Sequence, residues 1–108
     1  MDEQMFRKNS ESAIDALKRR LYDAEEDGGY EVEERGGALH LNFDDPPGVF
    51  VISPNAPVAQ IWISALSTSF KLDWSAEKSA FVLTKTGEEL AALMSRLIKE
   101  QSGNAVAL

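Results

Sequence analysis

The sequence of 108 residues contains no cysteine and only one histidine, His40. The absence of cysteine excludes disulfides, thiolate metal sites, cysteine-ligated clusters and thiol nucleophiles, and it fits a reducing compartment. A single histidine excludes two-histidine metal sites and catalytic triads with a histidine base. A glycine-rich phosphate loop and an HExxH motif are also missing. We therefore do not expect an enzyme.

Long apolar runs are missing as well. No stretch approaches the roughly 18 apolar residues of a membrane span, and the N-terminus, MDEQMFRKNS, lacks the basic-then-apolar order of a signal peptide. A chain of 108 residues is long enough for one domain with one hydrophobic core. We expect a soluble, cytoplasmic protein that forms a single domain over residues 1–108.

The formal net charge of −7 is unevenly distributed. Residues 1–34 hold 11 acidic and 5 basic side chains, so the rest of the chain is close to neutral. An acidic cluster without any base occupies residues 22–34 and consists of Asp23, Glu25, Glu26, Asp27, Glu31, Glu33 and Glu34. Such a field repels phosphate and excludes nucleic acid as the expected partner, whereas cations or a basic protein surface fit it.

Two helices are predicted. The first spans about residues 4–26, where apolar residues recur at spacings near three and four: Phe6, Ala13, Ile14, Leu17, Leu21 and Ala24. Ser10 is a candidate cap for a later start, and Gly28-Gly29 ends the helix. The second spans about residues 87–101, with one apolar face made of Leu90, Leu93, Met94, Leu97 and Ile98.

Thr86 and Glu89 have the spacing of a capping box at the start of this second helix. A short tail, residues 102–108, follows the helix. Because Ala105, Val106 and Leu108 are apolar, we expect the tail to lie in the groove between the two helices.

Six short strands are predicted between the helices, at about residues 30–34, 38–43, 49–53, 59–64, 70–74 and 80–84. Gly36-Gly37 is predicted to form a tight turn, and Pro54 and Pro57 to bracket a loop. Hairpin-length connections make the sheet antiparallel, and the amphipathic helices must cover one of its faces. The expected fold class is α+β, a two-layer α/β sandwich with the N- and C-terminal helices packed on one face of a roughly six-stranded antiparallel sheet.

The segment QIWIS, residues 60–64, places its largest side chain on the unexpected face of a strand. Strict alternation puts Ile61 and Ile63 on the buried side and Trp62 on the solvent side. A tryptophan in a strand is more often part of the core. The two isoleucines favour the outward position, and exposed aromatics beside small polar residues are typical anchors of protein interfaces.

Two interpretations of the acidic cluster are open. Charge runs at helix ends are usually solvated surface. Against this stand the mutual repulsion of seven carboxylates and their position near a helix C-terminus, both of which are unfavourable unless cations are bound. Oxygen ligands without imidazole or thiolate suit hard cations such as Fe³⁺, Mg²⁺, Ca²⁺ and Mn²⁺, bound loosely.

The segment VISPNAPVAQIWISALSTSFKLDW, followed by GEELAALMSRLI, closely resembles the frataxin family. The resemblance covers about residues 5–101 and includes the acidic cluster, the Gly36-Gly37 turn and Asp73-Trp74. It implies the two-helix, antiparallel-sheet fold described above. It also implies a role in iron–sulfur cluster assembly, as an iron donor or as a regulator of a complex of a cysteine desulfurase and a scaffold protein.

Carried over by position, the resemblance places weakly bound iron, Fe²⁺ or Fe³⁺, on the acidic cluster, where other divalent cations would compete. The expected metal-binding residues are Asp23, Glu25, Glu26, Asp27, Glu31 and Glu33. The expected contacts to the desulfurase and scaffold, on the open face of the sheet, are Asn55, Gln60, Trp62 and Lys71. The protein is expected to be a monomer, with an iron-dependent oligomer as the alternative.

The sequence departs from the family pattern at the end of the first helix, where Lys18, Arg19 and Tyr22 replace acidic residues and shorten the ridge. Other functions remain open, among them a protein-interaction module without an iron function. A small acidic secretion-type chaperone would explain the charge and size but not the QIW signature. A ferroxidase would require redox chemistry for which this ligand set is poorly suited.

Overall fold

A seven-stranded antiparallel sheet, in which every strand pairs with its neighbours along the chain, runs through the computed structural model, which describes residues 1–108. The strands are β1 Tyr30–Arg35, β2 Ala38–Asp44, β3 Pro47–Asn55, β4 Gln60–Ala65, β5 Thr68–Ser75, β6 Ala80–Leu83 and β7 Glu88–Glu89. The helices are α1 Glu3–Asp23, α2 Glu25–Gly28 and α3 Leu90–Ser102, with a 3₁₀ turn, η1, at Ala56–Val58. No helix is both long and apolar enough to cross a membrane.

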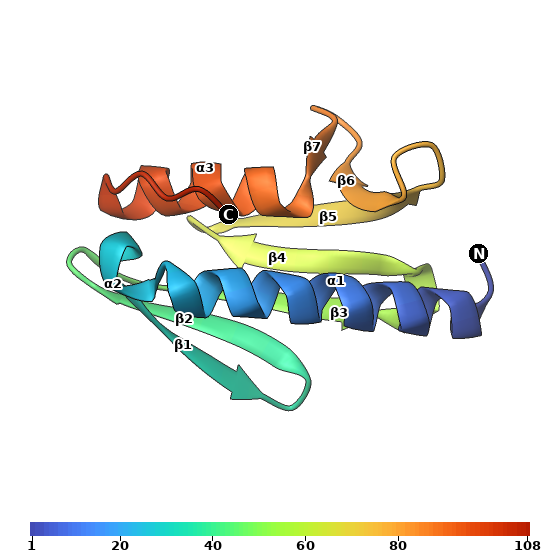
Figure 1. Cartoon of the computed structure of the whole chain (residues 1–108), viewed down its shortest axis with the longest axis horizontal. Coiled ribbons are helices and arrows are strands. Elements are labelled where there is room, and N and C mark those ends of the chain that lie inside the picture. Colours follow the sequence, from blue (N-terminus) through green and yellow to red (C-terminus); the bar gives the residue numbers. More distant parts are fainter.

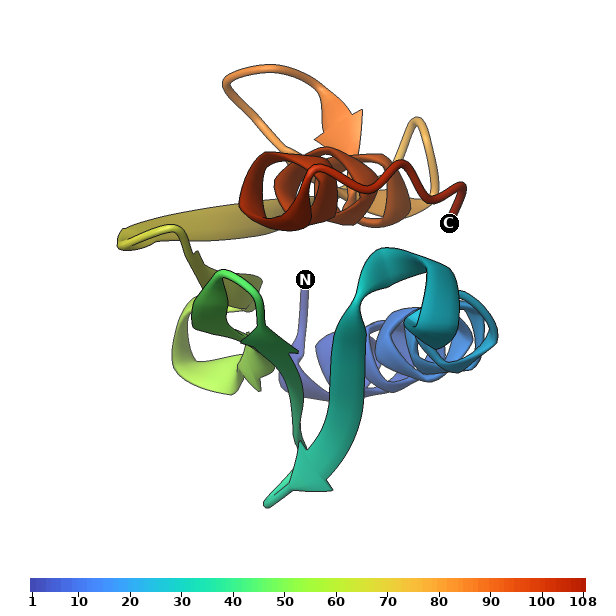
Figure 2. The ribbon, with the colours of Figure 1, turned by 90° about the vertical axis from the view of Figure 1, so that its left-hand side faces the viewer.

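The two long helices lie side by side and share one core with a single face of the sheet (Figures 1 and 2). Leu21 of α1 and Leu97 of α3 are fully buried together with Leu41 of β2 and Ile61 of β4. Alternate strand residues point to this core and the others to the open face, as the period of two requires. The predicted α+β sandwich is therefore confirmed, with one strand, β7, more than expected.

The first helix begins close to the predicted residue 4, but the alternative start at Ser10 and the predicted end are wrong. Asp2 is its N-cap and accepts a hydrogen bond from the backbone N of Met5 at 2.7 Å. Ser10 lies inside the helix, where it is buried and its hydroxyl donates to the carbonyl of Arg7. Ala24, with φ −98° and ψ 2°, leaves the helical conformation and separates α1 from the short α2. The predicted single helix to residue 26 is thus divided in two.

The turn at Gly36-Gly37 is confirmed, since both glycines have positive φ angles of 54° and 83°. The prediction that Pro54 ends the strand is wrong, because β3 continues through it to Asn55. Pairing of β3 with β2 reaches only Ile52, so Pro54 has a strand partner on its β4 side alone. A proline fits such a position because its missing N–H can face the side without a neighbouring strand.

The predicted capping box at the second long helix is not formed. Thr86 Oγ1 accepts a hydrogen bond from the backbone N of Glu88 and donates to the carboxylate of that residue, not of Glu89. Glu88 and Glu89 instead form β7, and α3 begins at Leu90 without a side-chain cap. The Arg96 guanidinium holds this start in place, with Nε and Nη2 donating to the two Glu88 carboxylate oxygens at 2.8 and 2.9 Å.

Replacing Glu88 by glutamine should destabilise the protein at neutral pH by about 1 kcal/mol, the upper range for a well-ordered surface pair. The hydrogen bond from Arg96 lowers the pKa of the Glu88 carboxyl in the folded state. The stabilisation is therefore complete above the unfolded-state pKa and is lost as the pH falls through the lower folded-state pKa. Urea unfolding at several pH values checks this. A difference between the two proteins that persists at acidic pH would contradict it.

The C-terminal tail turns at Gly103 and runs back along α3 (Figure 1). Asn104 Nδ2 donates to the carbonyl of Gly28 at the end of α2, and the backbone N of Leu108 donates to Ser95 Oγ on α3. Val106 and Leu108 are half-buried and pack on the core. These two side chains pack on the core, and the tail contacts α2 and α3, whereas Ala105 is exposed.

Deleting residues 104–108 should lower the free energy of unfolding by about 1–2 kcal/mol, because two half-buried apolar side chains and three hydrogen bonds are lost. For a domain of this size the melting temperature should fall by about 5–10 °C. Thermal unfolding followed by circular dichroism measures the effect. Deletion of Leu108 alone should produce part of it, and an unchanged melting temperature for the longer deletion would show that the tail contributes nothing.

Candidate docking and cation-binding surfaces

The open face of the sheet carries Trp62, a residue that is 36% exposed although Ile61 and Ile63 beside it are buried. The strand prediction for QIWIS and the outward position of the tryptophan are both confirmed. Trp62 lies opposite Ser53 of β3 and Lys71 of β5 in the sheet register. This places the largest exposed ring of the sheet between two short or flexible neighbours, where a second protein surface can reach it.

The four residues predicted to contact a partner lie together on this face. Asn55 is paired with Gln60, and Trp62 is paired with Lys71. The Trp62 indole Nε1 donates a hydrogen bond to Gln60 Oε1 at 2.9 Å. The Lys71 ammonium lies 4.8 Å from the centre of the indole ring, within the range of a cation–π contact. The structure thus brings these residues into one patch, which we call the Trp62 patch.

The acidic cluster lies on the neighbouring edge of the molecule, along the end of α1, α2 and β1. Glu31 and Glu33 point to the open face, because they pair with Asn42 and His40 of β2 on the non-core side. Most of the seven carboxylates are exposed, and only Glu25 and Glu33 are half-buried. Glu31 and Glu33 of the cluster therefore lie on the same face of the sheet as the Trp62 patch. The acidic residues of α1 and α2 lie at the edge of the sheet instead.

Three of the seven carboxylates already have partners within the chain. Glu25 Oε2 accepts a hydrogen bond from the backbone N of Val32 at 2.7 Å. Glu33 pairs with Arg35, and Glu34 pairs with Lys18. The other four, Asp23, Glu26, Asp27 and Glu31, have neither an ion pair nor a side-chain hydrogen bond.

No three carboxylate or imidazole side chains converge closely enough to hold a metal ion. The donor set nevertheless has the chemistry that hard cations prefer, since it consists of exposed carboxylate oxygens. The predicted residues are thus neighbours on one surface rather than ligands around one point. They can attract a hydrated cation by charge but do not form a coordination cage.

The sequence interpretation missed two residues of the acidic surface, Asn42 and Asp44. A shallow hollow beside α2 is lined by Glu25, Glu26 and Glu31 together with Asn42 and Asp44 of β2. The sequence contained a signal for them, because a two-residue turn at Gly36-Gly37 fixes residue 31 opposite residue 42.

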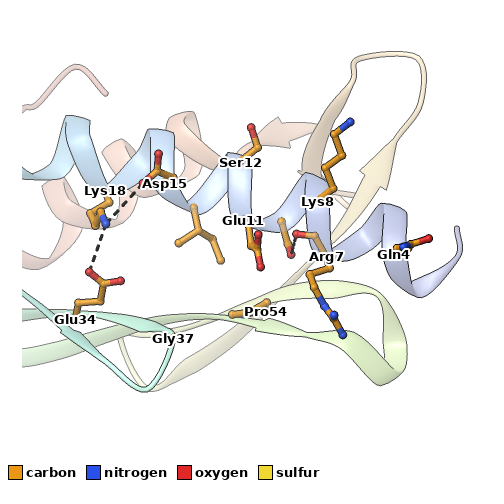
Figure 3. Close-up of a pocket in the computed structure, with 12 residues that line it drawn as sticks. Gln4, Arg7, Lys8, Glu11, Ser12, Asp15, Lys18, Glu34, Gly37 and Pro54 are labelled. Atoms are coloured by element: carbon orange, nitrogen blue, oxygen red, sulfur yellow. Dashed lines mark hydrogen bonds and ion pairs between the residues drawn. The ribbon is translucent and has the colours of Figure 1, made fainter.

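A second hollow lies between α1 and the β1–β2 hairpin, beside Pro54 (Figure 3). Its wall carries Lys18, whose ammonium lies 3.4 Å from Glu34 Oε2 and 3.6 Å from Asp15 Oδ1. The hydrogen bond and charge of Glu34 raise the pKa of Lys18, so the side chain stays charged. Lys18 therefore neutralises the charge of Glu34 at this end of the cluster.

Comparison with known proteins places these surfaces in context. The family model of the frataxin-like domain matches residues 1–104. The iron-sulfur cluster assembly protein CyaY of Janthinobacterium sp. (strain Marseille) is 28% identical over 110 aligned positions, which cover 100% of this chain and 96% of the relative. The protein of the same name from Pseudomonas paraeruginosa is 30% identical over 95 positions, covering 86% of this chain and 87% of the relative.

A solved structure supports the fold independently. Frataxin from Psychromonas ingrahamii superposes with a TM-score of 0.80, over 98% of this chain and 96% of that chain, at 20% sequence identity. At this identity the likeness concerns the arrangement of helices and strands.

Proposed function

Because the chain belongs to the frataxin family, we propose that it acts in iron–sulfur cluster assembly, as a cytoplasmic iron-binding protein that regulates a cysteine desulfurase–scaffold complex. Iron is cargo in this proposal and not a resident cofactor. The family match favours this function over a secretion-type chaperone, for which the comparisons offer no support.

The observation that carries the proposal is the exposed, hydrogen-bonded Trp62 on a face that no helix covers. An indole loses little entropy when it is buried by a partner, and an exposed one surrounded by polar side chains is a typical interface anchor. The acidic cluster lies next to it and fits a partner with a basic surface. A docked partner would therefore meet both features together.

The role of the acidic cluster in iron binding rests on its chemistry alone. Its exposed carboxylates leave most of the hydration shell of a cation in place, so we expect an affinity of about 1–100 μM. Two of the proposed residues are already engaged within the chain, since Glu25 accepts a hydrogen bond from the Val32 amide and Glu33 pairs with Arg35. Fe²⁺ or Fe³⁺ would bind without selectivity against other hard cations, and added salt would weaken the binding.

Replacing Asp23 and Asp27 together by asparagine should weaken Fe²⁺ binding several-fold in an anaerobic calorimetric titration. The same change should stabilise the fold by about 0.3–1 kcal/mol, because it removes repulsion near a helix C-terminus. A matched control replaces Glu11 and Glu77 by glutamine, which removes the same charge from exposed positions outside the cluster. Equal iron affinity for the two double variants would show that the cluster is not the binding site.

The proposed function as a whole is tested with the purified cysteine desulfurase and scaffold protein of the source organism. Addition of this protein should change the rate of cluster formation on the scaffold, and the protein should bind the desulfurase directly. If it neither binds nor alters the rate, at low ionic strength and with iron present, the proposed function is wrong.

A further inference from the structure

Asp73 links three strands across the open face, next to the Trp62 patch. In the sheet register it lies opposite Gln60 of β4 and Val82 of β6. Its Oδ1 accepts a hydrogen bond from Gln60 Nε2 at 3.0 Å, and its Oδ2 accepts one from Thr84 Oγ1 at 3.0 Å. Although the side chain is exposed, both of its oxygens accept hydrogen bonds, one from Gln60 of β4 and one from Thr84, the residue that directly follows β6.

These two contacts determine how the carboxamide of Gln60 is oriented. An ionised carboxylate only accepts hydrogen bonds, so the amide NH₂ group of Gln60 must face Asp73. The amide oxygen then faces Trp62, whose Nε1–H donates to it at 2.9 Å. Turning the amide by half a turn would place its NH₂ against the indole N–H and its oxygen against the carboxylate. Both of these contacts are unfavourable.

The indole is therefore held at two points. The edge that carries Nε1 is fixed through Gln60, and the Lys71 ammonium lies over the ring at 4.8 Å. An exposed tryptophan without such contacts would populate several side-chain rotamers. A partner would then have to select one of them, at a cost in affinity.

We propose that Asp73 and Thr84 are positioning residues, which act through Gln60 to preorganise Trp62 for docking. The identity of the docking partner rests on the proposed function, whereas the positioning of the indole rests on the hydrogen bonds alone. Thr84 fixes the Asp73 carboxylate, Asp73 fixes the Gln60 amide, and the amide fixes the indole. Removal of the Thr84 hydroxyl should therefore change the orientation or mobility of the Trp62 indole. Immobilising one side chain in advance corresponds to a two- to tenfold gain in affinity.

The most specific test replaces Thr84 by valine, a change of nearly equal shape that removes only the hydroxyl. In a ¹H–¹⁵N spectrum of the protein, the Trp62 indole N–H signal should shift, and its exchange with water should become faster. Thr84→Ser keeps the hydroxyl, so the shift and the exchange rate of the Trp62 indole N–H should stay close to those of the wild type. The indole signal of Trp74, on the opposite face of the sheet, is the internal reference and should change less.

Binding to the cysteine desulfurase of the source organism is measured for the same variants. Thr84→Val and Asp73→Ala should each weaken the affinity two- to tenfold, whereas Glu77→Gln, the charge control for Asp73→Ala, should not. Thermal unfolding confirms that each variant is folded.

Each outcome decides a separate question. An unchanged Trp62 signal in both Thr84→Val and Asp73→Ala overturns the positioning of Trp62, whatever the affinities are. A changed signal with unchanged affinity overturns its importance for docking. Absence of any binding by the wild-type protein contradicts the proposed function, while the spectra still decide whether Asp73 and Thr84 hold the indole.

Discussion

Replacing Trp62 by alanine is expected to weaken binding to the cysteine desulfurase by about 30-fold or more, which corresponds to about 2 kcal/mol. The free energy of unfolding should change by less than about 1 kcal/mol, because the indole is partly solvated and does not belong to the hydrophobic core. Equilibrium binding and urea unfolding of the same preparation measure the two effects. The expected result is a large loss of affinity with almost no loss of stability.

Trp74 provides the matched control, because it is the only other tryptophan in the chain. Its ring is half-buried on the core side and contacts Phe81 edge-on, with 5.1 Å between ring centres. Trp74→Ala should therefore destabilise the fold by about 3 kcal/mol. If Trp62→Ala costs as much stability as Trp74→Ala, the indole of Trp62 belongs to the core and not to a docking surface.

Replacing Gly28 by alanine is expected to destabilise the protein by about 2–3 kcal/mol, or roughly 10–20 °C in melting temperature. Gly28 does not need an unusual backbone angle. Its hydrogen atoms leave room for the ring of Tyr30, and a Cβ atom would lie 2.7 Å from Tyr30 Cδ2 and overlap Cε2 as well. The ring cannot move aside easily, because its hydroxyl donates to the carbonyl of Leu21 at 2.6 Å within the core.

A double-mutant cycle separates this clash from a general effect of alanine. In a Tyr30→Leu background the ring is absent, so Gly28→Ala should cost much less stability than in the wild type. Additive effects of the two substitutions would contradict the steric explanation. Gly36→Ala is a useful comparison, because a Cβ at Gly36 would meet no atom within 4 Å and only its positive φ of 54° causes strain.

Features of the fold that depend on local pattern could be predicted from the sequence. The strand predicted at about residues 38–43 has apolar side chains at every second position, Leu39, Leu41 and Phe43, and these three side chains are buried. The outward position of Trp62 followed from its two isoleucine neighbours. Local patterns sufficed here because a strand with one buried face has a fixed period of two.

Features that depend on pairing between distant segments could not be predicted in this way. Glu88 and Glu89 resemble the first turn of a helix, and only their pairing with β6 makes them a strand. Leu66 and Ser67 form the tight β4–β5 turn with positive φ angles of 53° and 59°, without the glycine or asparagine that usually marks such a turn. The register that this turn sets is also what brings Asp73 opposite Gln60.

The candidate site shows the same division. The sequence predicted which residues are acidic or exposed, because charge and alternation are local properties. It did not predict that Glu25 binds the Val32 amide or that Thr84 holds Asp73, because each contact joins different elements.

The hydrogen bond from Val32 to Glu25 has a further consequence for the solubility of the protein. β1 is an outermost strand, and its free edge could pair with the same edge of a second molecule. Glu25 accepts a hydrogen bond from one of the outward backbone amides, and Glu31, together with Glu26 and Asp27 of the adjoining α2, gives this border a charge that repels its own copy. Protonation or tight binding of multivalent cations would remove that repulsion. We expect the first aggregates under such conditions to form by strand-to-strand addition at β1, while the helical side of each molecule stays exposed.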